Sequence, residues 1–131
     1  MQNRLVLIIE DEPHNQMLFR DLLERDGYTV KIAGDAETGI EMARQERPGL
    51  ILMDIALPGM DGLEATRVLS ADSATQNIPV VAVSAHGQDV DSVRARDAGC
   101  LGYLIKPICI HTFRQSVALF LNGGAQLAAA A

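Results

Sequence analysis

Apolar runs alternate with amphipathic segments along the whole chain. Short apolar runs bounded by turn residues predict strands, and one of them alternates with polar residues as a half-buried strand does. The strands are expected at about 4–10, 28–33, 50–53, 80–83 and 101–105. Elsewhere, apolar residues at helical spacing predict helices at about 13–26, 35–46 with Asp35 as its cap, 63–71, 89–98 and 110–121. Strands and helices therefore alternate strictly.

Local signals mark both ends of the first predicted helix. Pro13 suits the first helical turn, and Gly27 is typical of the position just after a helix end. The buried face of this helix is expected to comprise Leu18, Phe19, Leu22 and Leu23.

The strict alternation predicts a parallel sheet. Parallel neighbours need a crossover connection, and strands that are apolar on both faces must be covered by helices on both sides. Right-handed crossovers then give a doubly wound α/β fold, in which a five-stranded parallel sheet is flanked by five helices. In such folds, binding sites form beyond the carboxyl ends of the strands.

Polar residues lie at the ends of four of the predicted strands. Glu10 and Asp11 end the first strand, and Asp54 follows the third. Ser84 follows the fourth strand and Lys106 the fifth. Because the carboxyl ends of parallel strands meet at one edge of a sheet, we expect these residues to form a single site.

The acidic residues of this group predict a metal ion. Neighbouring carboxylates repel one another unless a cation neutralises them or some take up protons. Mg²⁺ prefers oxygen ligands and keeps several waters, which leaves room for a phosphoryl oxygen. We expect Asp11 and Asp54 to bind it directly, with the backbone carbonyl of Ala56 as a third ligand. Glu10 would bind directly, bind through water or only support another ligand, and Mn²⁺ is the alternative ion.

Asp54 is the expected nucleophile of the site. Aspartate carboxylates can form phosphoenzyme intermediates, and phosphoryl transfer depends mainly on positioning and charge stabilisation. Lys106 would pair with one phosphoryl oxygen, and Ser84 would donate a hydrogen bond to another. A cis bond between Lys106 and Pro107 would direct the lysine inward, and an X–Pro bond costs only about 0.5–1 kcal/mol in the cis form.

Together these motifs resemble the receiver domain of two-component response regulators, over about residues 4–122. The resemblance rests on Glu10-Asp11, Asp54 within the loop 54–62, Ser84-Ala85 and Lys106-Pro107, in matching order and spacing. It implies a flavodoxin-like, CheY-like sheet with the strand order 2-1-3-4-5. Within the family, Asn15 and the segments that contain Asp54 and Ser84 look most like the single-domain DivK type.

The resemblance implies a phosphoacceptor signalling protein. Asp54 would receive a phosphoryl group from a phosphohistidine of a sensor histidine kinase or a histidine phosphotransfer protein, with Mg²⁺ required. The receiver would catalyse this transfer and its own dephosphorylation. Ser84 would then move toward the phosphoryl group while Tyr103 turned inward, although Tyr103 could instead be a static, half-buried aromatic. A downstream partner protein would recognise the fourth helix, fifth strand and fifth helix, around 90–98, Tyr103 and 109–114.

Two positions bear on the lifetime of the phosphate in such a receiver. Ala56 lies two residues after Asp54 and offers no side chain to guide or block a hydrolytic water. His86 lies two residues after Ser84, where it would tune water access to the phosphoryl group or simply be an exposed loop residue.

Other function classes fit the residues less well. A pseudo-receiver would bind its partner without phosphorylation, yet no site residue is missing from this chain. An aspartate-nucleophile phosphatase of the haloacid-dehalogenase kind needs a second aspartate where this chain has Ala56. A flavin site needs a Ser/Thr/Gly-rich loop after the first strand, where Glu10 and Asp11 would repel phosphate.

Size and composition indicate one domain. The chain has 131 residues, 48% hydrophobic and 21% charged, with a formal net charge of −6 at pH 7. We expect the domain to cover 1–122 and the Gly/Ala-rich tail 123–131 to be disordered, whether the regulator stands alone or belongs to a longer protein. Lacking a basic cluster, the chain is not expected to bind nucleic acid. Lacking a long apolar run, it is not expected to enter a membrane, and a cytoplasmic location is expected.

Overall fold

The computed structural model describes the backbone of residues 3–84, 89–121 and 129–130 and the side chains of 3–84 and 93–121. Its strands are β1 (Leu5–Ile9), β2 (Thr29–Ala33), β3 (Leu50–Asp54), β4 (Val80–Ser84), β5 (Gly102–Ile105) and β6 (Ala129–Ala130). Its helices are α1 (Pro13–Arg25), α2 (Ala36–Glu46), α3 (Gly62–Ala71), α4 (Asp89–Ala98) and α5 (Ile110–Leu121). The predicted alternation is thus confirmed. In these described segments, no helix has the length and apolar character needed to cross a membrane.

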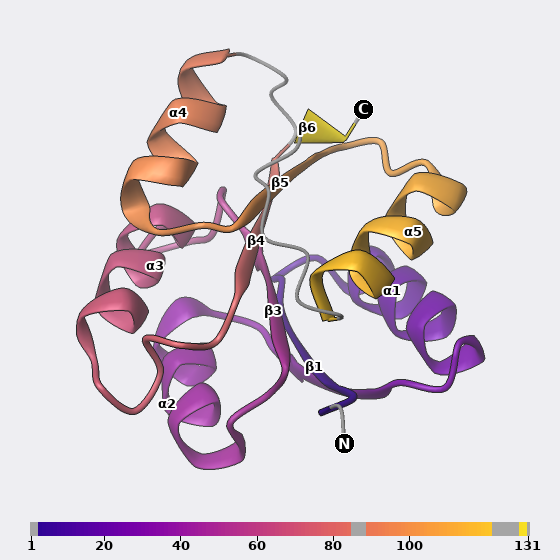
Figure 1. Cartoon of the computed structure of the whole chain (residues 1–131), viewed down its shortest axis with the longest axis horizontal. Coiled ribbons are helices and arrows are strands. Elements are labelled where there is room, and N and C mark those ends of the chain that lie inside the picture. The colour runs from indigo at the N-terminus through magenta and orange to yellow at the C-terminus, as the bar shows by residue number, and fades with distance from the viewer. Residues whose placement is uncertain (1–2, 85–88, 122–128, 131) are drawn as a thin grey trace.

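All strands of the sheet are parallel, in the order β2-β1-β3-β4-β5-β6. The first five strands therefore have the expected order 2-1-3-4-5. Helices α1 and α5 cover one face of the sheet, while α2, α3 and α4 cover the other (Figure 1). The result is the predicted three-layered, doubly wound architecture.

Strand β6 was not expected from the sequence. Ala129 pairs with Tyr103 and Ala130 pairs with Leu104, so two residues of the tail that was expected to be disordered form a strand. The edge of β5 offers backbone N–H and C=O groups that an extended segment of almost any sequence can satisfy. Pairing of this kind leaves no hydrophobic pattern in the sequence. Residues 123–128 and 131 of the tail lie outside the described residues.

The core is divided between the two faces of the sheet. Leu7 and Ile9 of β1 pack in one cluster with α2, α3 and α4, whereas Val6 and Ile8 pack in a second cluster with α1 and α5. Alternate residues of a strand point to opposite faces, and here both faces are covered. All five residues of β3 and all five of β4 are buried for this reason. Burial on both faces of the sheet explains why these strands are continuous apolar runs in the sequence.

Side-chain caps define the first residues of three helices. Glu12, Asp35 and Asp61 each accept a hydrogen bond from the backbone N–H three residues later. Asp35 is thereby confirmed as the cap of α2. The caps of α1 and α3 also fix the ends of the loops that follow β1 and β3, where the predicted site residues lie.

The predicted buried face of α1 is wrong at one position. Phe19, Leu22 and Leu23 are buried, but Leu18 is 40% exposed and lies next to Met17, which is 69% exposed. Phe19 stacks on Phe113 of α5 with 5.3 Å between ring centroids, and this contact sets which side of α1 faces inward. Successive helical residues are about 100° apart, so the residue before Phe19 lies at the rim of the buried stripe.

A side chain at position 62 should destabilise the fold, because α3 begins directly against the end of β3. A Cβ at this position would overlap the carbonyl oxygen of Asp54 and lie 2.8 Å from the Cα of Ile55. We expect Gly62→Ala to lower the free energy of unfolding by about 1–3 kcal/mol, measured by urea denaturation.

Gly34→Ala is the matched control for Gly62→Ala. The nearest atom to a Cβ at Gly34, Gln16 Nε2, would lie 4.0 Å away, which is an ordinary contact distance. Equal losses of stability in the two variants would contradict the steric explanation.

Candidate functional site

Strand register brings the predicted polar residues to one edge of the sheet. Ile9 lies opposite Met53, so Glu10 follows β1 beside Asp54 at the end of β3. Asp54 in turn lies opposite Val83, one residue before Ser84. Ser84 lies opposite Ile105, the residue before Lys106. Four strands therefore bring their carboxyl-terminal ends to the same place, as the sequence predicted.

Three carboxylates form the centre of the site. Glu10, Asp11 and Asp54 each place one carboxylate oxygen within 4.8 Å of the other two. Glu10 is 1% exposed and Asp54 6% exposed, whereas Asp11 is exposed to solvent. The site thus has two buried carboxylates and a third, on Asp11, that is exposed to solvent.

Lys106 supplies the positive charge at this centre. Its Nζ lies 3.0 Å from Glu10 Oε1, to which it donates a hydrogen bond, and 3.5 Å from Asp54 Oδ2. The peptide bond between Lys106 and Pro107 is cis, in agreement with the form considered from the sequence. The backbone N–H of Lys106 also donates to the carbonyl oxygen of Ser84, at 2.7 Å, so these two predicted residues are directly linked.

Burial and neighbouring charges change the ionisation of two groups in the site. Burial raises the pKa of Glu10, and the Asp54 carboxylate acts in the same direction, although hydrogen bonds from the Glu12 N–H and Lys106 oppose it. Burial alone would lower the pKa of Lys106, but Glu10 and Asp54 outweigh it, so its pKa is raised. Lys106 therefore keeps its charge at neutral pH.

The loop after β3 orients the Asp54 carboxylate. The backbone N–H of Ala56 donates to Asp54 Oδ1 at 3.1 Å, while Oδ2 faces Lys106. The Gly62 N–H donates to the Ile55 carbonyl oxygen at 3.0 Å and closes this loop. The two carboxylate oxygens of Asp54 thus have different environments, one beside the loop backbone and one beside the lysine.

Ser84 and Tyr103, the two predicted switch residues, are both buried. Ser84 is 3% exposed at the end of β4, and Tyr103 is 1% exposed on β5. The Tyr103 side chain packs in the same cluster as Ala95 and Ala98 of α4. Tyr103 is thus buried rather than half-buried, and its role as a switch stays a prediction.

Of the two positions predicted to affect phosphate lifetime, Ala56 lies within the described residues and His86 does not. Ala56 is exposed, and its side chain is only a methyl group. His86 lies outside the described residues, and its predicted effect on phosphate lifetime stays a prediction.

Sequence reasoning missed the contribution of Gln16. Its Nε2 donates a hydrogen bond to the backbone carbonyl oxygen of Glu10, at 2.6 Å. The residue lies in the first turn of α1 and is half-buried. A polar residue in a helix has no periodic signal that distinguishes a contact with a loop carbonyl from simple solvation, so the pattern could not have identified it.

The residues present fit a hard divalent cation. Three carboxylates and one ammonium leave the ionised cluster negatively charged, and every side-chain donor in the acidic group is an oxygen. Mg²⁺ binds carboxylates of this kind while keeping waters. The exposure of Asp11 gives an approach from solvent.

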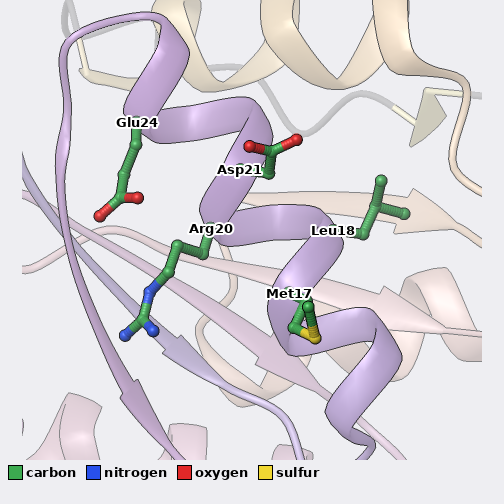
Figure 2. A pocket seen from close by; sticks show the side chains of 5 residues that line it. All are labelled: Met17, Leu18, Arg20, Asp21 and Glu24. Carbon is green, nitrogen blue, oxygen red and sulfur yellow. The ribbon is translucent and has the colours of Figure 1, made fainter.

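A hollow on another part of the surface is not lined by Glu10, Asp11 or Asp54. It has a volume of about 570 Å³ and is lined by Met17, Leu18, Arg20, Asp21 and Glu24, all on α1 (Figure 2). The charged side chains of Arg20 and Glu24 extend away from Leu18 in this view. Among the described residues, only α1 lines this hollow, and none of the acidic cluster reaches it.

Comparison with known families agrees with this site. A family model described as "Response regulator receiver domain" matches residues 6–118. The chain belongs to the response regulator receiver domain family. The two-component signalling class predicted from the motifs is therefore confirmed.

Relatives of this receiver include two proteins named "Polar-differentiation response regulator DivK". The Brucella anthropi protein is 41% identical over 117 residues, an alignment that covers 89% of this chain and 95% of that protein. The Brucella ovis protein is 42% identical over 118 residues, with the same coverage. The predicted similarity to the DivK type is confirmed.

One solved receiver domain with a similar fold is described with a metal ion. The receiver domain of sensor histidine kinase PA1611 from Pseudomonas aeruginosa PAO1 has a TM-score of 0.84 and 29% identity, with coverage of 92% of this receiver and 98% of that chain. It is described with a magnesium ion coordinated in the active site cleft. The acidic cluster of this receiver is consistent with such an ion.

Removal of the lysine charge should raise the pKa of Glu10 further. In Lys106→Ala, Glu10 would remain buried beside Asp54 without its cationic partner. We expect the Glu10 carboxyl resonance to titrate at higher pH than in wild type, measured by NMR in EDTA. Lys31→Ala, which breaks an exposed pair with Glu46, should leave it unchanged.

The same variant should show a pH-dependent loss of stability. A raised pKa means that the folded chain binds the Glu10 proton more tightly than the unfolded chain does. Lys106→Ala should therefore become progressively less stable than wild type as pH rises from the ordinary range of a glutamate toward neutrality, measured by urea denaturation. A stability difference that does not vary with pH would contradict the ion-pair assignment.

Proposed function

We propose that this receiver accepts a phosphoryl group on Asp54 from a phosphohistidine of a sensor histidine kinase or a histidine phosphotransfer protein. The observation that carries the proposal is the position of the Lys106 ammonium, 3.0 Å from Glu10 Oε1 and 3.5 Å from Asp54 Oδ2 at the end of the sheet. A nucleophilic carboxylate, further acidic groups and a fixed cation are the parts that phosphoryl transfer requires.

In the proposed reaction, an oxygen of the Asp54 carboxylate forms a bond to phosphorus as the bond between phosphorus and the donor histidine nitrogen breaks. Lys106 pairs with one phosphoryl oxygen, and the Ser84 hydroxyl donates a hydrogen bond to another. The Ala56 N–H, which donates to Asp54 Oδ1, helps to orient the nucleophile. The receiver thus contributes positioning and charge stabilisation to its own phosphorylation and dephosphorylation.

Mg²⁺ is the proposed cofactor, with Mn²⁺ as the alternative ion. When bound, it would neutralise negative charge on the phosphoryl oxygens. Asp11, Asp54 and the backbone carbonyl of Ala56 are the proposed ligands. Glu10 Oε1 already accepts from Lys106, and Oε2 accepts from the Glu12 N–H at 3.0 Å. These contacts favour a supporting role for Glu10, through water or through its neighbours.

The proposed output is a change in the surface that a downstream protein recognises. Ser84 would move toward the phosphoryl group, and Tyr103, already buried beneath α4, would be stabilised in its inward position. The partner surface would comprise α4, β5 and α5, where Val93 is 43% and Ile110 51% exposed. We place this signalling in the cytoplasm, with 1–122 as the receiver unit.

Phosphate lifetime would depend on the groups beside Asp54. The exposed Ala56 presents only a methyl group, so water would approach the phosphoryl group from this side without side-chain guidance. His86 is the other proposed determinant, through its position two residues after Ser84.

Phosphorylation can be tested directly by intact-mass measurement after incubation with Mg²⁺ and acetyl phosphate. We expect the wild-type chain to gain the mass of one phosphoryl group as an acid-stable, alkali-labile adduct. Asp54→Asn should gain none, because an amide is not a comparable nucleophile. Asp61→Asn is the matched control, since Asp61 caps α3 in the loop after Asp54 and asparagine is also a good cap.

Other results would indicate other functions. If the wild type gains no adduct from acetyl phosphate or from phosphorylated kinases, yet binds a partner, it acts as a pseudo-receiver. Steady release of phosphate from unrelated monoesters would indicate a phosphatase instead.

A further inference from the structure

The loop between β1 and α1 carries two of the three acidic residues. Glu10 and Asp11 lie in this loop, whereas Asp54 belongs to β3. Mutual repulsion of the carboxylates favours movement of the loop away from β3, because charges only a few ångströms apart interact strongly where water is limited. The short distances within the cluster therefore depend on contacts that fix the loop backbone.

Three hydrogen bonds between a side chain and the backbone help to fix this loop. The Glu10 carboxylate accepts from the Glu12 N–H at 3.0 Å, and the Glu12 carboxylate accepts from the Asn15 N–H at 2.8 Å. Gln16 Nε2 donates to the Glu10 carbonyl oxygen at 2.6 Å. In the first two bonds an acidic side chain accepts from a backbone N–H nearby. In the third, a neutral side chain of α1 contacts the peptide group that joins Glu10 to Asp11.

Gln16 is well placed to fix that peptide group. Its own backbone N–H donates to the Glu12 carbonyl oxygen at 3.0 Å, so its Cα belongs to the first regular turn of α1. On the other side, the Glu10 N–H donates to the Ala33 carbonyl oxygen of β2 at 3.0 Å. The backbone of Glu10 is thus attached to the sheet through its N–H and to α1 through its carbonyl oxygen.

We propose that Gln16 is a positioning residue for the metal site, which it serves by fixing the peptide group from which Asp11 extends toward Asp54. The proposal rests on the proposed function in one respect, namely that the acidic cluster binds Mg²⁺. Mg²⁺ requires nearly ideal placement of its few protein ligands. A residue that orients the backbone of a ligand should therefore alter metal affinity without contacting the metal.

The variant that tests this role is Gln16→Met. Methionine keeps a similar length and a high helix propensity but removes the N–H donor. Mg²⁺ affinity of the full chain is measured by isothermal titration without any phosphodonor. We expect the dissociation constant to rise about tenfold, because groups that support metal ligands typically change affinity by about 10- to 100-fold.

Gln45→Met is the matched control. Gln45 also lies on a helix and donates through Nε2, but to Glu41 on the surface of α2, at 3.1 Å. Its Mg²⁺ dissociation constant should equal that of the wild type. Urea denaturation in EDTA is measured in parallel, and we expect the two variants to unfold at similar midpoints.

The possible results distinguish a failure of the positioning role of Gln16 from a failure of the proposed metal binding. An unchanged dissociation constant in Gln16→Met would overturn the positioning role, whether or not the unfolding midpoint fell. An equal weakening of Mg²⁺ binding in Gln45→Met would also overturn it. If wild type bound no Mg²⁺ at millimolar concentration, the metal part of the proposed function would fail first, and the inference would fail with it.

Discussion

The electrostatic balance between three carboxylates and one lysine is the constraint on which the site depends. Like charges at this distance repel, and burial of Glu10 increases the cost of ionising its carboxyl group, which raises its pKa. Lys106 offsets part of that cost from the neighbouring strand end. The parallel register makes the balance possible, because it delivers side chains from β1, β3 and β5 to one edge. The helices on both faces exclude water from the strands and so keep this register fixed.

Much of the fold could be predicted because its two signals are local in the sequence. Strands covered on both faces need apolar residues at every position, and helices between them need an apolar stripe. The polar residues at the strand ends interrupt this pattern, so Asp54 and Lys106 are visible without a structure. Their convergence follows from parallel topology alone. Ser84 is linked to Lys106 through the backbone, which agrees with that reasoning.

What the sequence could not predict depends on geometry between elements. The exposure of Leu18 follows from how α1 rotates when Phe19 stacks on Phe113, and a helical stripe alone does not set that angle. Gln16 contacts a backbone carbonyl, an acceptor present at every residue, so no motif marks the pair. Glu10 illustrates the same limit, because its carboxylate oxygens are engaged by Lys106 and by a loop N–H rather than facing the site freely.

The short strand β6 has a consequence for how other proteins could recognise this surface. It pairs with Tyr103 and Leu104, so that β5 has a neighbouring strand on each side at these two positions. A partner segment cannot pair with the backbone of β5 at these two positions while β6 is in place. A partner at this edge of the sheet would then depend on the side chains of the flanking helices, whose sequence can differ between receivers, more than on the peptide groups of β5, which all receivers share.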